Sequence, residues 1–316
     1  MTAAIGMCFD RTFPPALVTE FARRLEEGGA DELWVIEDCF YTAGVSLAAA
    51  ALTATGRLRV GIGILPAVAR NPAITAMEIA TLCGLAPGRL LPGIGHGVQS
   101  WMGQMGARTP SPLTTLREVL EAVRRLLAGE RVTVRGKYVT LDEVRLDQPP
   151  AEAPPVYAGV RGPKSLAVAG QAADGVVLAD AVSPAYVRWA LERAGSPDGF
   201  RVAVLATLCV AADRAEAYRR AAPWLSDQLA ESHVSLRQVP FFDELVALHE
   251  KSGLDGLVTM PPDWWAELGP IGTIDDAAGH LDALEAAGAT NIALFPAPDL
   301  EIARGQVDQV LRLAQR

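Results

Sequence analysis

The clearest chemical signal in the chain is a short turn that joins an apolar run to a helix. It consists of Gly159, Val160, Arg161 and Gly162, and Pro163 follows at a position typical of a first helical turn. Free backbone N–H groups at the start of a helix attract anions, and Arg161 and Lys164 add positive charge. The turn is therefore predicted to bind a phosphate group. The alternative is an ordinary connection in which Pro163 only begins the helix.

Two adjacent acids, Glu37 and Asp38, follow another apolar run, which ends at Ile36. A carboxylate at the end of a buried strand can accept a hydrogen bond from a ligand or transfer a proton as a general acid or base. Glu37 and Asp38 are therefore candidate catalytic residues. The alternative, a pair of solvated loop acids or a salt bridge to a neighbouring strand, agrees equally well with the composition.

Glycines are concentrated in two further runs, Gly61-Ile62-Gly63-Ile64 and Gly93-Ile94-Gly95-His96-Gly97. Because glycine weakens a strand unless another group must approach the backbone closely, these runs are predicted to lie against a ligand; tight packing in a barrel bend is the alternative. Imidazole can move protons near neutral pH, so His96 is a third catalytic candidate. Local hydrogen bonding is expected for the histidines that fall in predicted helices, His233, His249 and His280.

These candidates follow strands whose order predicts a closed barrel. Strands are predicted at residues 4–9, 33–36, 58–65, 90–95, 156–158, 175–178, 201–210 and 291–295. Helical patterns separate them, and this repeated alternation favours a (β/α)₈ TIM barrel over an open sheet. The first turn, residues 9–13, also lacks the glycine pattern of a dinucleotide-binding turn. Because the loops that follow barrel strands meet at one face, the candidates should share one site.

Two segments interrupt this alternation. Alternating apolar residues around Arg135-Gly136-Lys137 predict a β-hairpin at residues 131–145. Residues 213–271 have mostly helical patterns and form an insertion before the last strand, and no motif in them indicates a role. We therefore expect residues 1–316 to form a single barrel domain with a hairpin insertion and a helical insertion.

The composition excludes several classes of protein. The chain has 316 residues, 50% of them hydrophobic, and a formal net charge of −9, which disfavours binding to nucleic acid or anionic membranes. No apolar stretch approaches the ~20 residues of a membrane span. The four cysteines are scattered, and no histidines and acids cluster at metal-ligand spacing, so no metal is expected. Reduced thiols are typical of the cytoplasm, where we expect the chain to reside.

Taken together, the motifs resemble those of the luciferase-like oxidoreductases. The resemblance covers most of the chain, weakens between residues 213 and 271, and rests on runs such as Asn71-Pro72-Ala73, Pro87-Gly88-Arg89, Gly93-Ile94-Gly95-His96-Gly97, Pro155-Val156-Tyr157-Ala158-Gly159 and Ala287-Gly288-Ala289. Within that family the chain is most similar to the coenzyme F420-dependent branch, such as methylenetetrahydromethanopterin reductase. Family members are often dimers, so the resemblance also implies a homodimer.

The resemblance implies coenzyme F420, a deazaflavin, as the cofactor, with FMN as the alternative. The ring would lie against Gly63 and Ile64, where the family commonly has a non-prolyl cis peptide, and the phosphate would lie on the turn described above. Glu37 and Asp38 match positions that flank the ring, with Asp38 in place of a histidine that is frequent in relatives. The expected cofactor contacts are Gly63, Ile64, Gly95, His96, Gly97, Gly159, Val160, Arg161 and Gly162.

Two departures from the family pattern concern the substrate. Cys8 stands where relatives similar to the methanopterin reductase carry a glutamate on the first strand, which argues against a pterin substrate. The loop after the fourth strand is bulkier and more apolar than in that enzyme, which favours an apolar substrate; packing beneath the loop is the alternative. The residues expected to contact the substrate are Cys8, Phe40, Tyr41, Trp101 and Met102.

The predicted activity is hydride transfer between F420 and a small unsaturated or carbonyl compound. An FMN-dependent monooxygenase that uses reduced flavin and oxygen has the same fold, and these motifs do not separate the two. A non-catalytic flavin-binding paralogue is a third possibility, because Cys8 and Asp38 depart from the family pattern. A phosphosugar-type barrel enzyme is a fourth, if the phosphate turn holds substrate.

Overall fold

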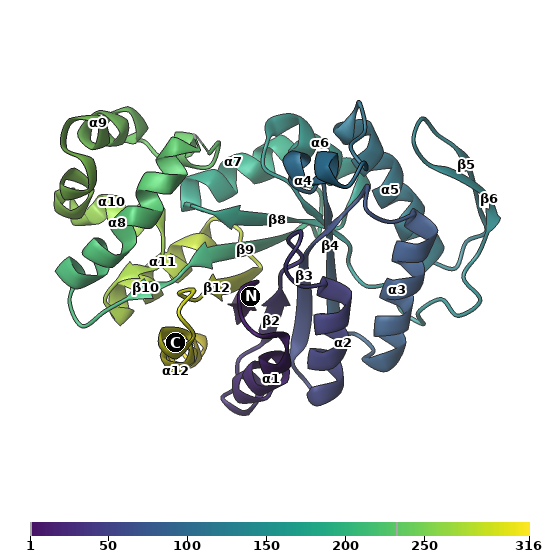
Figure 1. Ribbon diagram of the computed structural model, residues 1–316, viewed down its shortest axis with the longest axis horizontal. Helices are drawn as coiled ribbons and strands as arrows, with labels where there is room; N and C mark the ends of the chain where they lie inside the picture. The colour runs from purple at the N-terminus through teal and green to yellow at the C-terminus, as the bar shows by residue number, and fades with distance from the viewer. Residues whose placement is uncertain (1, 232) are drawn as a thin grey trace.

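Eight parallel strands close into a barrel (Figure 1). The computed structural model describes residues 2–231 and 233–316. Around the barrel the strands follow the order β1, β12, β9, β8, β7, β4, β3, β2. Their bounds are Ala4–Phe9 (β1), Glu32–Val35 (β2), Arg59–Pro66 (β3), Leu90–Gly95 (β4), Tyr157–Gly159 (β7), Gly175–Asp180 (β8), Arg201–Thr207 (β9) and Asn291–Phe295 (β12). The predicted (β/α)₈ barrel is confirmed.

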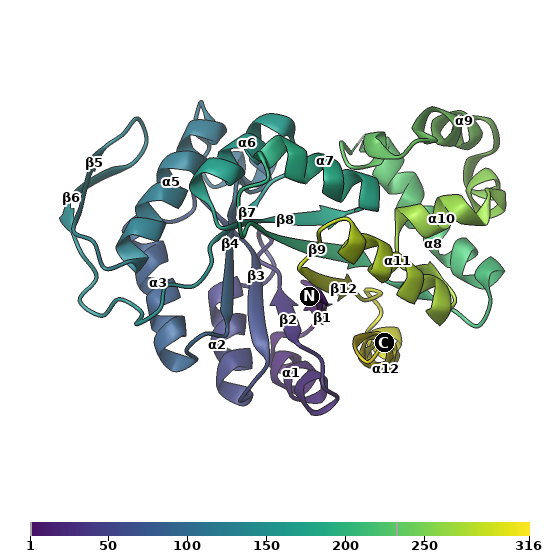
Figure 2. The same ribbon diagram turned by 180° about the vertical axis from the view of Figure 1, so that it is seen from behind.

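Helices cover the outside of the barrel, as the opposite views in Figures 1 and 2 show. Their bounds are Val18–Glu27 (α1), Gly44–Ala54 (α2), Pro72–Leu85 (α3), Pro112–Leu127 (α5), Pro163–Ala172 (α6), Pro184–Ala194 (α7), Ile274–Ala286 (α11) and Leu300–Ala314 (α12), with a 3-10 turn at Pro15–Leu17 (η1). In α5, Leu116, Leu120 and Val123 are buried at helical spacing, whereas Arg117 and Glu121 are exposed. This apolar stripe faces the barrel and explains why the segment packs as a helix there.

Several predicted strand ends differ from the structure by one or two residues, and two segments differ by more. The seventh barrel strand, predicted at residues 201–210, ends at Thr207, and Cys209–Val210 (β10) pairs outside the barrel with Ile271–Gly272 (β11). The N–H of Cys209 donates to the Pro270 carbonyl (3.1 Å), so the strand changes partner where the insertion returns to it. A short helix, Gln99–Gln104 (α4), also forms in a segment predicted as a loop.

The predicted hairpin forms from Val132–Arg135 (β5) and Thr140–Val144 (β6), which pair antiparallel. Figure 1 shows it beyond α3 and α5, at one end of the molecule. Glu118 ties its turn to α5. The Glu118 carboxylate accepts hydrogen bonds at 2.8 to 2.9 Å from the backbone N–H groups of Lys137, Tyr138 and Val139.

The helical insertion has an apolar core of its own. It contains Arg214–Ala230 (α8), Phe242–Thr259 (α9) and Pro262–Leu268 (α10), with a 3-10 turn at Leu236–Gln238 (η2). Within this core Tyr218 stacks on the buried Trp265, with ring centroids 5.1 Å apart. Figures 1 and 2 both show these helices at the end of the molecule opposite the hairpin.

His280 is buried where α11 meets the insertion. Its Nδ1–H donates to the carbonyl of Ala266 in α10 (2.7 Å). Burial lowers the pKa of His280 to about 4. An unfolded chain takes up a proton at a histidine near pH 6.5. The folded chain does not take up that proton until about pH 4. The free energy of unfolding therefore falls as the pH falls from about 6.5 to about 4.

Acidification from pH 8 to pH 5 should therefore destabilise the protein, with His280 accounting for about 2 kcal/mol of the loss. His280→Asn keeps a donor near the Nδ1 position but does not titrate, so its unfolding free energy should change less between the two pH values. Urea unfolding at each pH measures this. His249→Asn, at a partly exposed histidine in α9, is the matched control and should behave like the wild type. Equal pH dependence in His280→Asn and the wild type would contradict the prediction.

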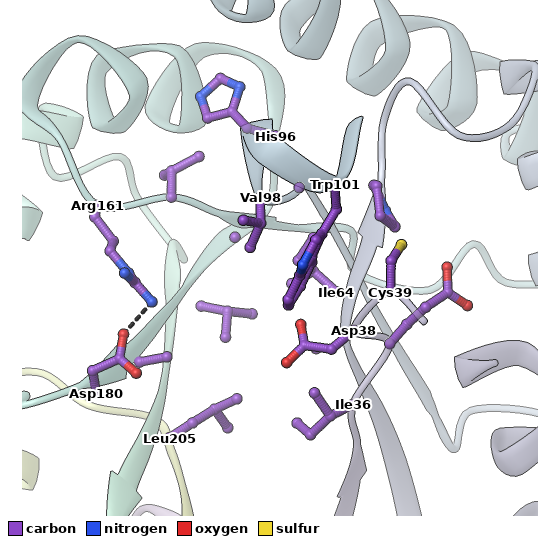
Figure 3. A pocket seen from close by; sticks show the side chains of 18 of the residues that line it. Ile36, Asp38, Cys39, Ile64, His96, Val98, Trp101, Arg161, Asp180 and Leu205 are labelled. Atoms are coloured by element: carbon purple, nitrogen blue, oxygen red, sulfur yellow. Dashed lines mark ion pairs between the residues drawn. The ribbon is translucent and has the colours of Figure 1, made fainter. Parts of the chain in front are cut away.

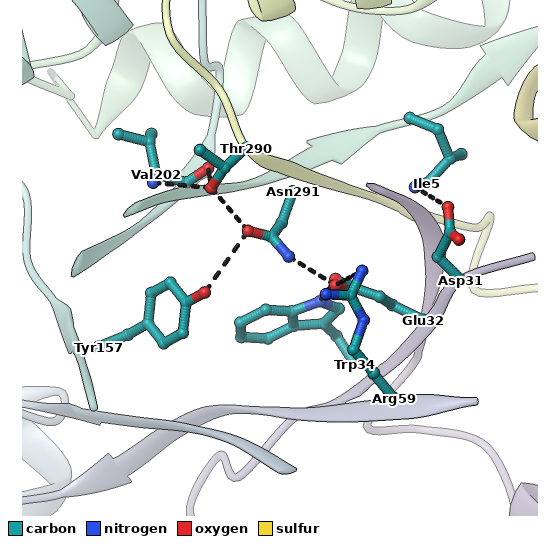
Figure 4. A network of polar contacts seen from close by, with 9 residues as sticks. All are labelled: Ile5, Asp31, Glu32, Trp34, Arg59, Tyr157, Val202, Thr290 and Asn291. Atoms are coloured by element: carbon teal, nitrogen blue, oxygen red, sulfur yellow. Dashed lines mark hydrogen bonds and ion pairs between the residues drawn. The ribbon is translucent and has the colours of Figure 1, made fainter. Parts of the chain in front are cut away.

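A buried polar network lies at the barrel end where the strands begin (Figure 4). The wholly buried Glu32 carboxylate accepts hydrogen bonds from Trp34 Nε1 (2.8 Å) and Asn291 Nδ2 (2.5 Å), and it pairs with Arg59 (2.9 Å). Burial raises the pKa of Glu32. Residues at this end of a TIM barrel serve stability, whereas the carboxyl ends of the strands serve function.

No helix within residues 2–231 and 233–316 has the length and apolar character needed to cross a membrane. The described part of the chain also contains no group of three or more His, Cys, Asp or Glu side chains that could hold a metal ion. The four cysteines are free thiols.

Candidate active site

A cavity of about 440 Å³ opens at the carboxyl ends of the barrel strands (Figure 3). The cavity is lined by residues from the loops after β2, β4 and β7 and from the ends of β3 and β8. Apolar side chains from several strands also line it, among them Ile64, Val177, Leu205 and Phe295. The loops that carry the candidate residues therefore meet around one cavity, as barrel geometry requires.

A bulge in β3 at Gly63 and Ile64 lines this cavity. The Gly63–Ile64 peptide is cis, as the family resemblance implies. Ile64 packs closely on neighbouring glycines, since a Cβ on Gly159 would lie 2.5 Å from Ile64 Cγ2. A Cβ on Gly95, which is buried behind the lining, would lie 2.5 Å from the Gly159 carbonyl oxygen. Side chains at residues 95 and 159 would therefore displace Ile64 or β7.

Glu37 is a structural anchor for the loop after β2. Its side chain is only 9% exposed, and both carboxylate oxygens are occupied. Arg70 donates from Nη1 and Nη2 at 2.5 and 2.9 Å, and the N–H of Gly44, the first residue of α2, donates at 2.8 Å. The Glu37 carboxylate in turn raises the pKa of Arg70. Glu37 thus joins the loops after β2 and β3 to the start of α2.

Asp38 faces the cavity, and Figure 3 shows its carboxylate on the cavity side of the loop. It forms an ion pair with Arg11, which follows β1. Arg11 also lies over the ring of Tyr41, 4.8 Å from the ring centroid. With 28% of its side chain exposed, Asp38 is a positioned but accessible carboxylate.

His96 lies at the edge of the cavity, and Figure 3 shows its ring turned away from Asp38. Its Nε2 is 2.9 Å from the hydroxyl of Ser165 in α6. Burial lowers the pKa of His96, so the ring is neutral at neutral pH. A role for His96 in proton transfer stays a prediction.

The predicted phosphate turn forms one side of the cavity. Gly159 ends β7, and Gly162 immediately precedes α6. No side chain caps α6, so the first N–H groups of the helix have no partner within it. A Cβ on Gly162 would meet no atom within 4 Å, so there is open space beside the turn. All four turn residues line the cavity, namely Gly159, Val160, Arg161 and Gly162.

Arg161 is held by groups from three other segments. It forms an ion pair with Asp180 at the end of β8, and its Nη1 lies 3.1 Å from His233 Nδ1. The hydroxyl of Tyr186 in α7 donates to the Arg161 carbonyl (3.0 Å). His233 Nε2 in turn lies 2.6 Å from a carboxylate oxygen of Glu231. The helical insertion therefore contacts the phosphate turn through His233.

Sequence reasoning missed two residues that hold Arg161: Asp180, which lines the cavity, and His233, which lies outside the lining. Asp180 ends an apolar strand, and an acid at that position could have been recognised in the sequence as a candidate site residue. The placement of His233 in a helix is wrong, because it lies between α8 and η2. Its partner Arg161 is 72 residues away, so no local spacing could reveal the contact. His249 and His280 are in helices, as predicted.

The residues predicted to contact the substrate are divided between the cavity and its surroundings. Trp101 and Met102, both in α4, line the cavity. Cys8 is wholly buried in β1 and is not part of the lining. Phe40 and Tyr41 are 67% and 54% exposed and also lie outside the lining. Substrate contact by all five residues stays a prediction.

The sequence profile of the family described as luciferase-like monooxygenase matches residues 4–291. The chain belongs to this family. The prediction that it is an enzyme of the luciferase-like family is thereby confirmed.

Curated relatives of this luciferase-like chain include enzymes of two activities. A 5,10-methylenetetrahydromethanopterin reductase from Methanolobus tindarius is 31% identical over 173 residues, which cover 55% of this chain and 53% of that protein. An F420-dependent glucose-6-phosphate dehydrogenase from Kineococcus radiotolerans is 30% identical over 177 residues, which cover 52% of each. The chain thus spans about half the length of these two relatives.

The fold of this chain also occurs in solved structures. An F420-dependent secondary alcohol dehydrogenase, in complex with an F420–acetone adduct, superposes on this chain with a TM-score of 0.78 and 23% identity. The superposition covers 100% of both chains. This likeness shows that the two proteins have the same fold.

Proposed function

We propose that this luciferase-like chain is a coenzyme F420-dependent oxidoreductase that transfers a hydride between the deazaflavin and a small organic substrate. The observation that carries the proposal is that the uncapped start of α6, the Arg161 turn and the β3 bulge all border one cavity. One cavity thus offers a place for an anionic group and a place for a flat ring. The F420-dependent activities named for the dehydrogenase relatives favour F420 over FMN.

The residues present fit such a cofactor. Its phosphate would be held by backbone N–H groups of the turn and by the Arg161 guanidinium, in the open space beside Gly162. Its ring would lie against Gly63 and Ile64. When bound, the deazaflavin supplies the hydride chemistry. Asp180 and His233 restrict the Arg161 side chain, so less conformational freedom is lost when an anion binds.

The chain itself would supply proton transfer and exclusion of water. Oxidation of an alcohol to a carbonyl compound releases the proton of its hydroxyl group, and the reverse reaction takes this proton up again. Asp38 lines the cavity with an accessible carboxylate, so we assign that proton to an Asp38 carboxyl oxygen. Trp101 and Met102 on α4 form the wall that limits access of water.

Titration of the purified chain with F420, followed by cofactor fluorescence, tests the proposal. We expect saturable binding, and about tenfold weaker binding for Arg161→Ala because a charged hydrogen-bond donor is lost. Arg108→Ala, at an exposed arginine before α5, is the matched control and should bind F420 like the wild type. No binding of F420 to the wild type would overturn the proposal.

An FMN-dependent monooxygenase is the second candidate function. The matching family supports it, because that family is described as luciferase-like monooxygenase. Reduced flavin would occupy the same cavity and react with oxygen. Tighter binding of FMN than of F420 in the same titration would favour this candidate. Tight cofactor binding without turnover on a broad substrate panel would favour a non-catalytic paralogue.

We also propose that the protein is a cytoplasmic homodimer. Ile74, Met77 and Leu85 form an exposed apolar stripe along α3, which a second copy could cover. Free cysteines are typical of a reducing compartment. Light scattering of the purified protein should give twice the mass of one chain, and the mass of a single chain would contradict the dimer.

A further inference from the structure

Each acidic side chain that lines the cavity already has a cationic partner. The ion pairs are Glu37–Arg70, Asp38–Arg11 and Asp180–Arg161. Among the residues that the structure describes, Arg161 is the only lysine or arginine in the lining. It belongs to the turn that the cofactor phosphate would occupy. A phosphorylated substrate would therefore find no unpaired cation there, and burial of an unpaired charge is costly.

The opposite side of the cavity is apolar. Figure 3 shows Arg161 and Asp180 on one side, and Ile36 and Trp101 on the other. Ile36 is 6% exposed and belongs to the buried cluster beneath the cavity. Two carboxylates, Glu37 and Asp38, line this side, and both are already paired. Glu37 is only 9% exposed, so a substrate placed here would meet apolar surface and one accessible carboxylate, that of Asp38.

Trp101 projects from α4 into this space (Figure 3). The next residue, Met102, is wholly buried and anchors the helix. Its sulfur packs beside Gly97, where an added Cβ would lie 3.0 Å from it. Gly97 has a φ of 68°, a conformation that favours glycine and lets the chain turn directly from β4 into α4. Packing of Met102 therefore holds in place the helix that carries Trp101.

We infer that the substrate is an uncharged, largely apolar carbonyl compound or alcohol that packs on Trp101, with its oxygen directed to Asp38. This inference rests on the proposed function and narrows its substrate class. In the oxidising direction, the alcohol carbon loses a hydride, which oxidised F420 gains, and the hydroxyl group loses its proton to the Asp38 carboxylate; the reducing direction is the reverse and begins with Asp38 protonated. The phosphorylated substrate in the name of the glucose-6-phosphate dehydrogenase relative would be excluded.

Calorimetric titration of the F420-loaded protein with cyclohexanone and with glucose 6-phosphate tests the inference. We expect saturable binding of cyclohexanone and none of the sugar phosphate at the same concentrations. Trp101→Ala should weaken cyclohexanone binding about tenfold, because apolar contact area is lost. Trp101→Phe keeps an aromatic ring and should stay within about threefold of the wild type. Thermal unfolding checks that both variants are folded.

The outcomes separate this inference from the proposed function. Sugar phosphate binding as tight as cyclohexanone binding, no saturable cyclohexanone binding, or unchanged affinity in Trp101→Ala would each overturn the inference. The proposed function would survive any of these results, because F420 binding is measured independently. If F420 itself does not bind to the wild type, the proposed function fails and the inference fails with it.

Discussion

Replacement of Asp38 by asparagine should lower the turnover number about 100-fold, with little change in stability. The Asp38 carboxylate lines the cavity, is partly exposed and pairs with Arg11 at the edge of the site. Asparagine retains its shape and a hydrogen-bond acceptor but cannot exchange a proton. The substrate oxygen would then depend on water, which the cavity wall restricts.

Turnover in this test is followed by the absorbance of F420, and stability by urea unfolding. Asp142→Asn, at an exposed acid in the hairpin, is the matched control and should leave both quantities unchanged. Asp38→Asn with wild-type turnover would contradict the assignment of the proton to Asp38. A large loss of stability would contradict the view that Asp38 contributes little to the stability of the fold.

Other polar residues predicted for the site are less suited to exchange a proton with the substrate oxygen. The His96 ring is turned away from Asp38 and lies against Ser165. Cys8 is wholly buried, and burial raises the pKa of its thiol well above the usual range. Both carboxylate oxygens of Glu37 are taken up by Arg70 and a backbone N–H. The geometry therefore singles out Asp38.

The barrel could be predicted because its strands are short apolar runs separated by amphipathic helices. That pattern is local, and barrel geometry alone then brings the loops after the strands together. Glu37, Asp38, His96 and the turn from Gly159 to Gly162 accordingly line one cavity. The early end of β9 could not be predicted, because it depends on a hydrogen bond to residue 270 at the end of the insertion.

The environments of individual side chains could not be predicted, because they depend on partners that are distant in the sequence. Glu37 and Asp38 are adjacent, and each forms an ion pair, yet the Glu37 side chain is 9% exposed and the Asp38 side chain is 28% exposed. The difference arises from Arg70, 33 residues after Glu37. His233 likewise acquires its place beside Arg161 only because the insertion folds back onto the barrel.

Glu37→Gln should show the opposite behaviour to Asp38→Asn and lower the free energy of unfolding by about 3 kcal/mol. Glu37 is 9% exposed and pairs with both Nη atoms of Arg70, whose side chain is 21% exposed and whose Nε pairs separately with Glu78 (3.1 Å). Glutamine turns one acceptor oxygen into a donor amide that faces either Arg70 or the N–H of Gly44. One buried donor then loses its partner, and the loop before α2 loses its anchor.

A double-mutant cycle separates loss of the ion pair from a general effect of either substitution. Arg70→Gln alone should also destabilise the protein, because it leaves the buried Glu37 carboxylate without a cation. Glu37→Gln combined with Arg70→Gln removes both charges, so its cost should be smaller than the sum of the single costs. Urea unfolding of the four proteins measures this coupling. Additive costs would show that Glu37 and Arg70 act independently, which would contradict a stabilising role for their ion pair.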